Sequence, residues 1–306
     1  MLDREAYFLY SCQKTLVVHV VCVYIGGIWM IESAQENALI AVLEQVMHHH
    51  LTQAQRGLLP STINPHKLKY VLDINCRIGA WAIDLALSYP GVHVTGLDGD
   101  AAFIDLARRN ADIGAVSRTR FYESNPLKRL PLANATFDLV HSLQLAPVFR
   151  PGEWPFFLSE CKRVMKPEAA ITLMSLSIGP TSSDAYQRLL TMFDALLLKL
   201  GYSFSERPGT GTPGVYLFRL LKEAGFVNPS YTIHPVNFGG TNNAGGRACC
   251  QLLAGIAQKQ KPLFLEHNMI HAEEFDALLQ EKQHDIGEAN YCTTGALIVA
   301  SAYAPS

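Results

Sequence analysis

The chain has 306 residues, of which 49% are hydrophobic and 17% charged, and its formal charge at pH 7 is −2. This length and composition allow a sizeable buried core, so we expect one principal domain with insertions. Lys and Arg total 25 against 27 Asp and Glu, and no basic stripe is interleaved with aromatic residues, which argues against nucleic acid as a partner. Small molecules are the expected ligands.

Cysteine and histidine spacing gives no sign of a metal site or of a disulfide framework. The seven cysteines include no Cys-x-x-Cys pair, and their odd number favours a reducing cytoplasm. Cys249 and Cys250 are expected in the core. The adjacent histidines at 48–50 would point in different directions on a helix, so we expect a solvated helix face and no bound metal.

Residues 1–31 form a hydrophobic extension that has no counterpart in the rest of the chain. The run 15–31 is nearly uncharged and reaches only the lower edge of membrane-spanning length. We expect a cytoplasmic protein, with membrane association through residues 15–31 as the alternative. A further interpretation is that the natural start is Met30, so that residues 1–29 are not part of the native protein.

Residues 32–67 are predicted to form an N-terminal helical cap. Apolar residues recur at helical spacing between Glu32 and Leu59, and Pro60 and Pro65 then lead into the first strand.

The stretch 70–98, YVLDINCRIGAWAIDLALSYPGVHVTGLD, predicts strand, tight turn, helix and strand. It ends in Asp98, which follows Gly79 by nineteen residues. In doubly wound α/β folds, an acidic residue at about this spacing accepts hydrogen bonds from a ribose, and the turn receives the ligand's negative group. The turn lacks the G-x-G-x-x-G fingerprint of dinucleotide-binding proteins, since its positions are Asn75, Arg77 and Ala80.

The same turn resembles the first motif of the class I S-adenosylmethionine-dependent methyltransferases, hydrophobic-L-D-x-G-C-G-x-G, through Val71, Leu72, Asp73, Cys76 and Gly79. The resemblance covers about residues 68–176. Thr95-Gly96-Leu97-Asp98 matches the second motif, residues 130–142 match the fourth, and residues 160–167 match the E-x-x-R-V-L-K-P segment. It implies a seven-stranded Rossmann-like sheet with an antiparallel last strand, and S-adenosylmethionine as cofactor.

The resemblance also implies the residues around that cofactor. These are Asp73, Asn75, Cys76, Arg77, Gly79, Asp98, Gly99, Asn125, Pro126 and His141. Asn75 and Arg77 replace glycines of the family, and Asn125 stands where many relatives carry an adenine-reading aspartate. Asparagine tolerates left-handed backbone, whereas Arg77 either blocks the pocket or pairs with the ligand's carboxylate. Cys76 is expected to be a small packing residue.

Beyond residue 176 the motifs fade, which is typical of the half that shapes an acceptor pocket. We assign residues 68–306 to the methyltransferase-like domain, with helical insertions around 180–225 and 242–285. Helices are expected at 184–200, 216–224, 244–258 and 272–283. Strands are expected at 226–238 and 292–303, and residues 203–214 are either a mobile loop or a plain connector.

The function implied by the resemblance is methyl transfer to a small-molecule, secondary-metabolite-like acceptor. His141 follows the fourth strand and is the candidate base, with pocket lining or backbone bonding as the competing role. His234 is a weaker candidate, and Asp138 is expected to support the strand end. A methyltransferase-fold protein that has lost transfer activity, and serves binding, regulation or other chemistry, is the alternative. The oligomeric state stays open, with a homodimer as one option.

Overall fold

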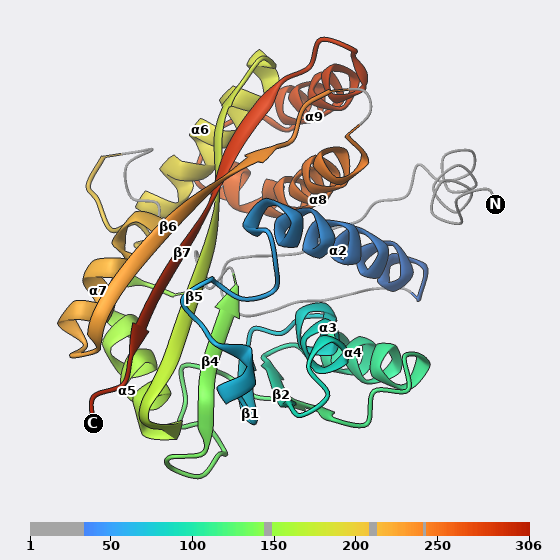
Figure 1. The fold of residues 1–306 in the computed structure, drawn as a ribbon. Coiled ribbons are helices and arrows are strands. Elements are labelled where there is room, and N and C mark those ends of the chain that lie inside the picture. The colour runs from blue at the N-terminus through green and yellow to red at the C-terminus, as the bar shows by residue number, and fades with distance from the viewer. Residues whose placement is uncertain (1–33, 144–148, 208–212, 241–242) are drawn as a thin grey trace.

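A computed structural model describes residues 34–143, 149–207, 213–240 and 243–306, and Figure 1 shows a single twisted sheet with helices on both faces. The described strands are β1 (Tyr70–Ile74), β2 (His93–Asp98), β3 (Thr119–Glu123), β4 (Phe137–Leu143), β5 (Met165–Thr181), β6 (Val227–Asn237) and β7 (Thr293–Tyr303). The described helices are α2 (Ala34–Gln55), α3 (Ala80–Ser88), α4 (Ala101–Ile113), α5 (Trp154–Val164), α6 (Asp184–Lys199), α7 (Leu217–Glu223), α8 (Ala244–Glu266) and α9 (Ala272–Gly287). Three short 3-10 turns cover Pro65–Lys67, Pro151–Glu153 and Pro213–Tyr216.

The strands lie in the order β3-β2-β1-β4-β5-β7-β6. Strands β1 to β5 pair in parallel, and β7 runs antiparallel between β5 and β6. The doubly wound, seven-stranded sheet with an antiparallel last strand is therefore confirmed. The strand order changes direction beside β1, so the carboxyl ends of β1 and β4 form the crevice where such folds bind ligands.

Alternate residues of the parallel strands supply the two core layers. Leu72 and Val140 face the layer built with α5 and α7, whereas Val71 and Leu139 face the layer built with α3 and α4. Because successive side chains of a strand point to opposite faces, a buried strand must be apolar on both. This explains the continuous apolar runs that identified these strands.

Helix α2 packs on α8 and lies above α3 in Figure 1. His48 Nε2 lies 2.8 Å from Asp84 Oδ2 of α3, and His50 Nε2 lies 2.8 Å from the Asn237 carbonyl oxygen of β6. The expectation of a solvated histidine face is wrong for His48, which is buried, because α2 turns this side toward α3. His49 is exposed, as expected.

Helix α8 is longer than its sequence pattern predicts, because it continues beyond residue 258 to Glu266 with Pro262 inside it. Phe264 of this last turn is fully buried in a cluster with side chains of α6 and α9. The burial of this ring compensates for the hydrogen bond that proline cannot make. Cys249 and Cys250 of α8 are fully buried, which confirms their placement in the core.

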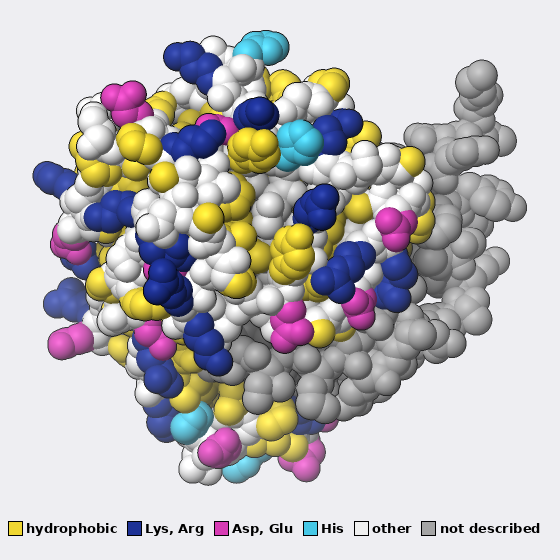
Figure 2. All heavy atoms as spheres, turned by 90° about the horizontal axis from the view of Figure 1, so that it is seen from below, with side chains coloured by type: hydrophobic (Ala, Val, Ile, Leu, Met, Phe, Trp, Pro, Cys, Tyr) yellow, Lys and Arg dark blue, Asp and Glu magenta, His cyan; other side chains and the backbone are white. Residues whose placement is uncertain are grey.

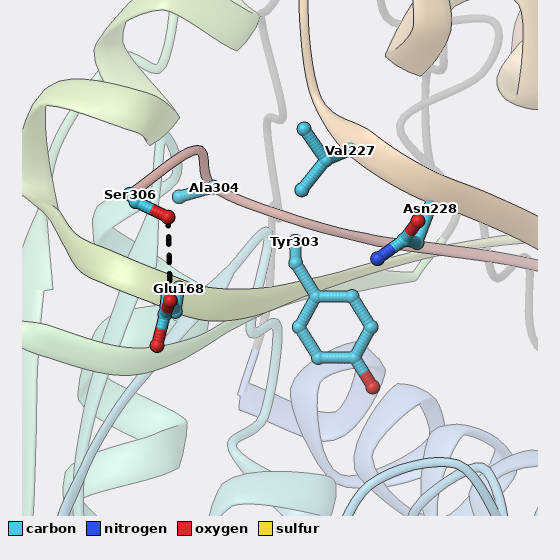
Figure 3. Close-up of a pocket in the computed structure, with 6 residues that line it drawn as sticks. All are labelled: Glu168, Val227, Asn228, Tyr303, Ala304 and Ser306. Carbon is cyan, nitrogen blue, oxygen red and sulfur yellow. Dashed lines mark hydrogen bonds between the residues drawn. The ribbon is translucent and has the colours of Figure 1, made fainter.

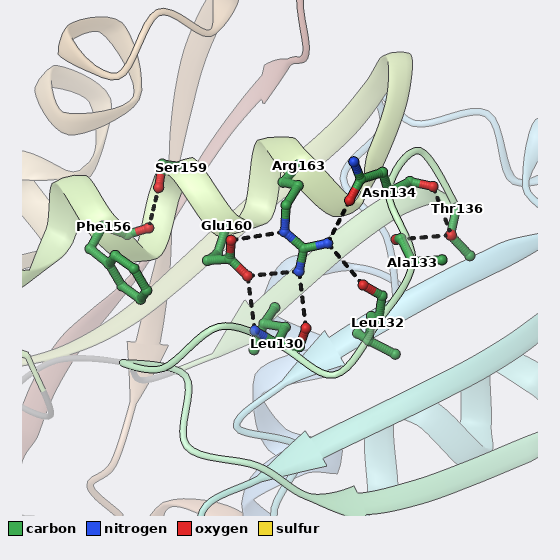
Figure 4. A network of polar contacts seen from close by, with 9 residues as sticks. All are labelled: Leu130, Leu132, Ala133, Asn134, Thr136, Phe156, Ser159, Glu160 and Arg163. Atoms are coloured by element: carbon green, nitrogen blue, oxygen red, sulfur yellow. Dashed lines mark hydrogen bonds and ion pairs between the residues drawn. The ribbon is translucent and has the colours of Figure 1, made fainter.

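A polar network fixes the loop before β4, as Figure 4 shows. Arg163 of α5 donates to Glu160, to the carbonyl oxygens of Leu130 and Leu132, and to Asn134 Oδ1, while Glu160 accepts from the Leu130 amide. The hydrogen bonds from Arg163 lower the pKa of Glu160 even though burial opposes them. The E-x-x-R segment thus holds the Leu-Pro loop in place.

The amino-terminal ends of β1 and β4, away from the crevice, carry further structural contacts. Asp138 accepts hydrogen bonds from the Lys69 and Tyr70 amides and from Lys166 Nζ, which confirms its role as a support of the strand end. Nearby, a shallow hollow of about 400 Å³ is lined by Glu168, Tyr303 and Ser306 (Figure 3). Seen from below in Figure 2, Lys and Arg side chains are mixed with acidic and hydrophobic ones.

The residues of the hydrophobic extension, 1–31, lie outside the described part of the chain. Within the described ranges, no helix is long and apolar enough to cross a membrane.

Candidate functional site

The turn between β1 and α3 keeps the shape of a glycine-rich turn although two of its glycines are replaced. Asn75, Arg77 and Gly79 have φ angles of 62°, 52° and 74°, in the left-handed region. This conformation costs an L-residue roughly 1–2 kcal/mol, less for asparagine. Tertiary contacts therefore hold Arg77 in a backbone state that glycine would adopt without strain.

Gly79 is the glycine of this turn that the packing requires. A Cβ atom there would lie 2.7 Å from Phe121 Cζ and 3.0 Å from Ala107 Cβ. Cys76 is also buried, with its thiol pKa raised by burial, and it packs in the layer that contains Phe121. Gly79 and Cys76 thus pack the turn against the core layer that contains Phe121.

Asp98 lies at the tip of β2, next to the turn. Its Oδ2 accepts from the Arg77 amide at 2.9 Å and its Oδ1 from the Asp100 amide at 3.0 Å. Burial raises the pKa of Asp98 to about 6, against the charge of Arg77 and the two amide hydrogen bonds, which lower it. The carboxylate retains lone pairs for two ribose hydroxyls.

The Arg77 side chain crosses from the turn to the cap helix α2. Its Nε lies 2.7 Å from Glu44 Oε1, its Nη2 pairs with the same oxygen, and its guanidinium lies 4.2 Å above the Phe103 ring. Both side chains are at least nine-tenths buried. Neither sequence alternative for Arg77 describes this contact, because the partner comes from a helix 33 positions earlier.

His141 lies at the end of β4, beside Asp73 of β1. Its Nδ1 lies 2.9 Å from Asp73 Oδ1, its Nε2 lies 3.2 Å from Met174 Sδ, and the Trp81 ring stacks on it at 3.6 Å. A carboxylate facing Nδ1 favours the tautomer with its hydrogen on Nδ1, which leaves Nε2 as the acceptor nitrogen. His141 is thus an oriented imidazole, as a general base requires.

A small cavity of about 20 Å³ lies next to this imidazole, under α2. Its lining includes His48 and Gln55 of α2, together with Trp81, His141 and Met174. Gln55 is 7% exposed, and its Nε2 has no hydrogen-bond partner within the described residues. The space is about that of one water molecule.

The remaining predicted residues lie apart from this cluster or beside it. Gly99 and Asn125 are exposed, and Asn125 Oδ1 accepts from the Leu127 amide at 2.8 Å, next to the half-buried Pro126. The exposed amide of Asn125 is available to a ligand that reaches the carboxyl edge of β3. His234 bonds to Thr232 on β6 and does not join the site.

Sequence reasoning missed Glu44, Gln55 and Trp81. Glu44 carried one signal, because it is a charged residue beside the apolar stripe of its helix. Gln55 carried none, since an amide at a helix end is usually solvated. Among the described residues, no group of three or more His, Cys, Asp or Glu could hold a metal ion.

Several known proteins that resemble this chain are methyltransferases. The model of a family described as "Methyltransferase domain" matches residues 71–168. The chain is 33% identical to the release factor glutamine methyltransferase of Chlorobaculum tepidum over 175 residues, which are 56% of this chain and 55% of that protein. It is 32% identical to the demethylmenaquinone methyltransferase of Deinococcus radiodurans over 173 residues, 56% of this chain and 69% of that one.

A solved structure supports the fold. The phosphoethanolamine N-methyltransferase 2 of Haemonchus contortus, in complex with S-adenosyl-L-methionine, has a TM-score of 0.50 at 15% identity, over 90% of this chain and 59% of that one. The sheet order and the turn define a class I methyltransferase domain. The chain belongs to the S-adenosylmethionine-dependent methyltransferase family.

The residues of the turn fit the cofactor of this family. The positive-φ backbone retains the shape of a glycine turn, Asp98 lies at the tip of β2 where the family resemblance predicts a ribose contact, and Arg77 and Glu44 present a positive and a negative group side by side. Asp98 is only 3% exposed, so a ribose reaches it only when side chains over the turn move.

Proposed function

We propose that the chain transfers a methyl group from S-adenosylmethionine to a small acceptor that loses a proton in the reaction, such as a hydroxyl compound. The observation that carries this proposal is the buried Asp73–His141 pair beside the cavity under α2. The cofactor supplies an inherently reactive methyl group on a sulfonium, so the protein contributes chiefly positioning and, where needed, a base.

His141 is proposed to take the acceptor's proton at Nε2. Asp73 holds the ring through Nδ1 and stabilises the imidazolium that forms, while stacking on Trp81 prevents the ring from turning. The acceptor oxygen would gain the methyl group as the bond between that group and the sulfonium sulfur breaks, which leaves the thioether S-adenosylhomocysteine, and the proton would pass from His141 to solvent.

Enclosure favours a small acceptor. His141 is 2% exposed and lies beneath α2, so a side chain of a folded protein substrate would reach it only after a large displacement of that helix. The Chlorobaculum relative is named for a protein glutamine and the Deinococcus relative for a quinone. A small molecule also needs α2 to move, because the cavity holds about one water molecule, but it needs less space than a folded protein, and this supports the second kind of acceptor.

Exchange of His141 for asparagine tests the proposal. We expect a loss of about 10²–10⁴-fold in kcat with little change in the affinity for S-adenosylhomocysteine, because removal of a positioned base affects the chemical step. The assay would use radiolabelled S-adenosylmethionine with a panel of small phenols and hydroxyquinones. His234→Asn, which alters a histidine of β6 outside the site, is the matched control. Transfer that is equally fast in the His141 variant would contradict the role of His141.

A second candidate function is a methyltransferase-fold protein without transfer activity. The observation that favours it is the buried Arg77–Glu44 pair at the cofactor turn. Calorimetric titration with S-adenosylmethionine separates the two, since a non-catalytic protein whose pocket is closed by Arg77 binds no cofactor at millimolar concentration.

A further inference from the structure

We infer that Glu44 and Arg77 together form the subsite for the zwitterionic amino-acid end of the cofactor, Arg77 taking its carboxylate and Glu44 its ammonium. The inference rests on the proposed function for the cofactor itself. It assigns a ligand-binding role to Glu44, on the cap helix, and explains why arginine replaces glycine in the turn.

The first support is the chemical match. A buried guanidinium and a buried carboxylate lie in direct contact, with Arg77 Nε 2.7 Å from Glu44 Oε1. An α-amino acid carries the same two charges on neighbouring atoms. Arg77 can therefore exchange the Glu44 carboxylate for the ligand carboxylate, and Glu44 can exchange the guanidinium for the ligand ammonium. The cluster of four charges then stays neutral.

The second support is the position of residue 77. Its amide donates to Asp98, the carboxylate at the ribose position, and its side chain leads away from that point to Glu44. Arg77 thus links Asp98, where the nucleoside would bind, to the Arg77–Glu44 pair, where groups of both charges could bind a ligand. A nucleoside that carries an amino-acid end has this arrangement.

The third support is that the guanidinium is held in place independently of Glu44. Its Cζ lies 4.2 Å from the centroid of the Phe103 ring, a contact that does not involve Glu44 and can persist when the carboxylate is exchanged. A planar, oriented guanidinium is suited to bidentate contact with a carboxylate. Glu44 is carried by α2, so binding of an ammonium to it would also fix the cap helix over the turn.

Two ligands that differ only in the amino-acid end test this subsite. S-adenosylhomocysteine has it, whereas 5′-methylthioadenosine keeps the nucleoside and a thioether but lacks both charges. We expect the wild-type chain to bind S-adenosylhomocysteine at least about tenfold more tightly in calorimetric titration, as charge-assisted hydrogen bonds usually provide.

Variants then show which residues cause the preference for S-adenosylhomocysteine over methylthioadenosine. Glu44→Gln and Arg77→Ala should each weaken S-adenosylhomocysteine binding by about tenfold to hundredfold while leaving methylthioadenosine binding within about twofold. Arg77→Lys keeps one positive charge and guards against a folding defect, and it should retain part of the preference. His50→Gln, which removes a contact of α2 with β6 away from Arg77, is the matched control and should keep the full preference.

Three results would overturn the assignment. One is equal binding of both ligands by the wild type, and another is tighter cofactor binding by Arg77→Gly, which would make Arg77 an obstruction. If the wild type binds neither ligand, the proposed function fails as well. If the wild type prefers S-adenosylhomocysteine over methylthioadenosine but transfers no methyl group, only the proposed function is contradicted.

Discussion

Two buried cationic side chains of this chain, Arg77 and Lys282, have different kinds of partner. Arg77 pairs with the carboxylate of Glu44, brought by another helix, and lies at the cofactor turn. Lys282 of α9 is 1% exposed, donates to the Cys250 carbonyl oxygen at 3.1 Å and lies 4.2 Å from the Tyr186 ring, and it has no ion pair within the described part of the chain. Burial lowers the pKa of Lys282 to about 7.

This difference indicates a ligand-binding role for Arg77 and a structural role for Lys282. Arginine stays charged at any physiological pH, so a buried guanidinium needs an anion from the protein or from a ligand. A buried lysine can lose its proton instead, and then needs only neutral partners. On this view Arg77 is ready to change partner, whereas Lys282 connects α9 to the backbone of α8.

Removal of Arg77 alone should have the largest effect on stability. Arg77→Met leaves Glu44 buried without its ion-pair partner, and we expect the free energy of unfolding to fall by about 3–5 kcal/mol. Urea denaturation without ligand measures it. The double variant Arg77→Met/Glu44→Leu removes both charges and should recover most of the loss. A double variant as unstable as the single one would show that the charge of Glu44 is not the cause.

Exchange of Lys282 for methionine should increase the free energy of unfolding, whereas Arg77→Met should decrease it. The folded pKa of Lys282 lies below its unfolded value, so the unfolded chain binds more protons between about pH 7 and pH 10, and stability rises with pH across that window. Lys282→Met should raise the free energy of unfolding at pH 7 by on the order of 2 kcal/mol and remove this dependence. Thermal unfolding at several pH values checks both, and an unchanged slope would contradict a buried, titrating Lys282.

Cofactor affinity should depend on Asp98, which accepts a hydrogen bond from the Arg77 amide of the cofactor turn. A ribose that donates to the carboxylate requires its ionised form, and the pKa of Asp98 is raised to about 6. Affinity for S-adenosylhomocysteine should therefore be constant above pH 7 and fall about tenfold at pH 5. Calorimetry across this range measures the change. Asp98→Asn should bind weakly at both pH values, whereas a pH dependence that persists in this variant would point to another group.

The smallest effect is expected for the hydrogen bond between His48 of the cap helix and Asp84 of α3. His48 is buried, but the side chain of Asp84 is 42% exposed, so solvent screens their interaction. His48→Gln should lower the free energy of unfolding by less than about 1 kcal/mol. A loss as large as that of Arg77→Met would mean that attachment of α2, and not the charge at position 77, controls stability here.

Much of the fold could be predicted because central strands such as β1 and β4 are short, mostly apolar runs. The predicted strand at 70–74 and helix at 184–200 lie within one residue of the observed β1 and α6. The end of α8 was missed because Pro262 usually ends a helix, and only tertiary packing of Phe264 shows why it does not.

The site could be predicted in part. Asp73, Arg77, Gly79, Asp98 and His141 lie at or beside the crevice because the family motifs place them near the carboxyl ends of β1, β2 and β4 and in the turn after β1. The contacts of Arg77 with Glu44 and of His141 with Trp81 depend on how α2 and α3 pack, which helical periodicity does not specify. Long-range partners of charged side chains were therefore the part that sequence reasoning could not supply.

The position of β7 has a consequence for the order in which the chain folds. Residues 293–303 fill the place between β5 and β6, so β6 has no neighbour in the sheet until β7 has been synthesised. Strands β1 to β5 can pair while the ribosome is still translating, whereas the exposed edge of β5 must wait. The interval between these two events is when the nascent chain is most exposed to aggregation.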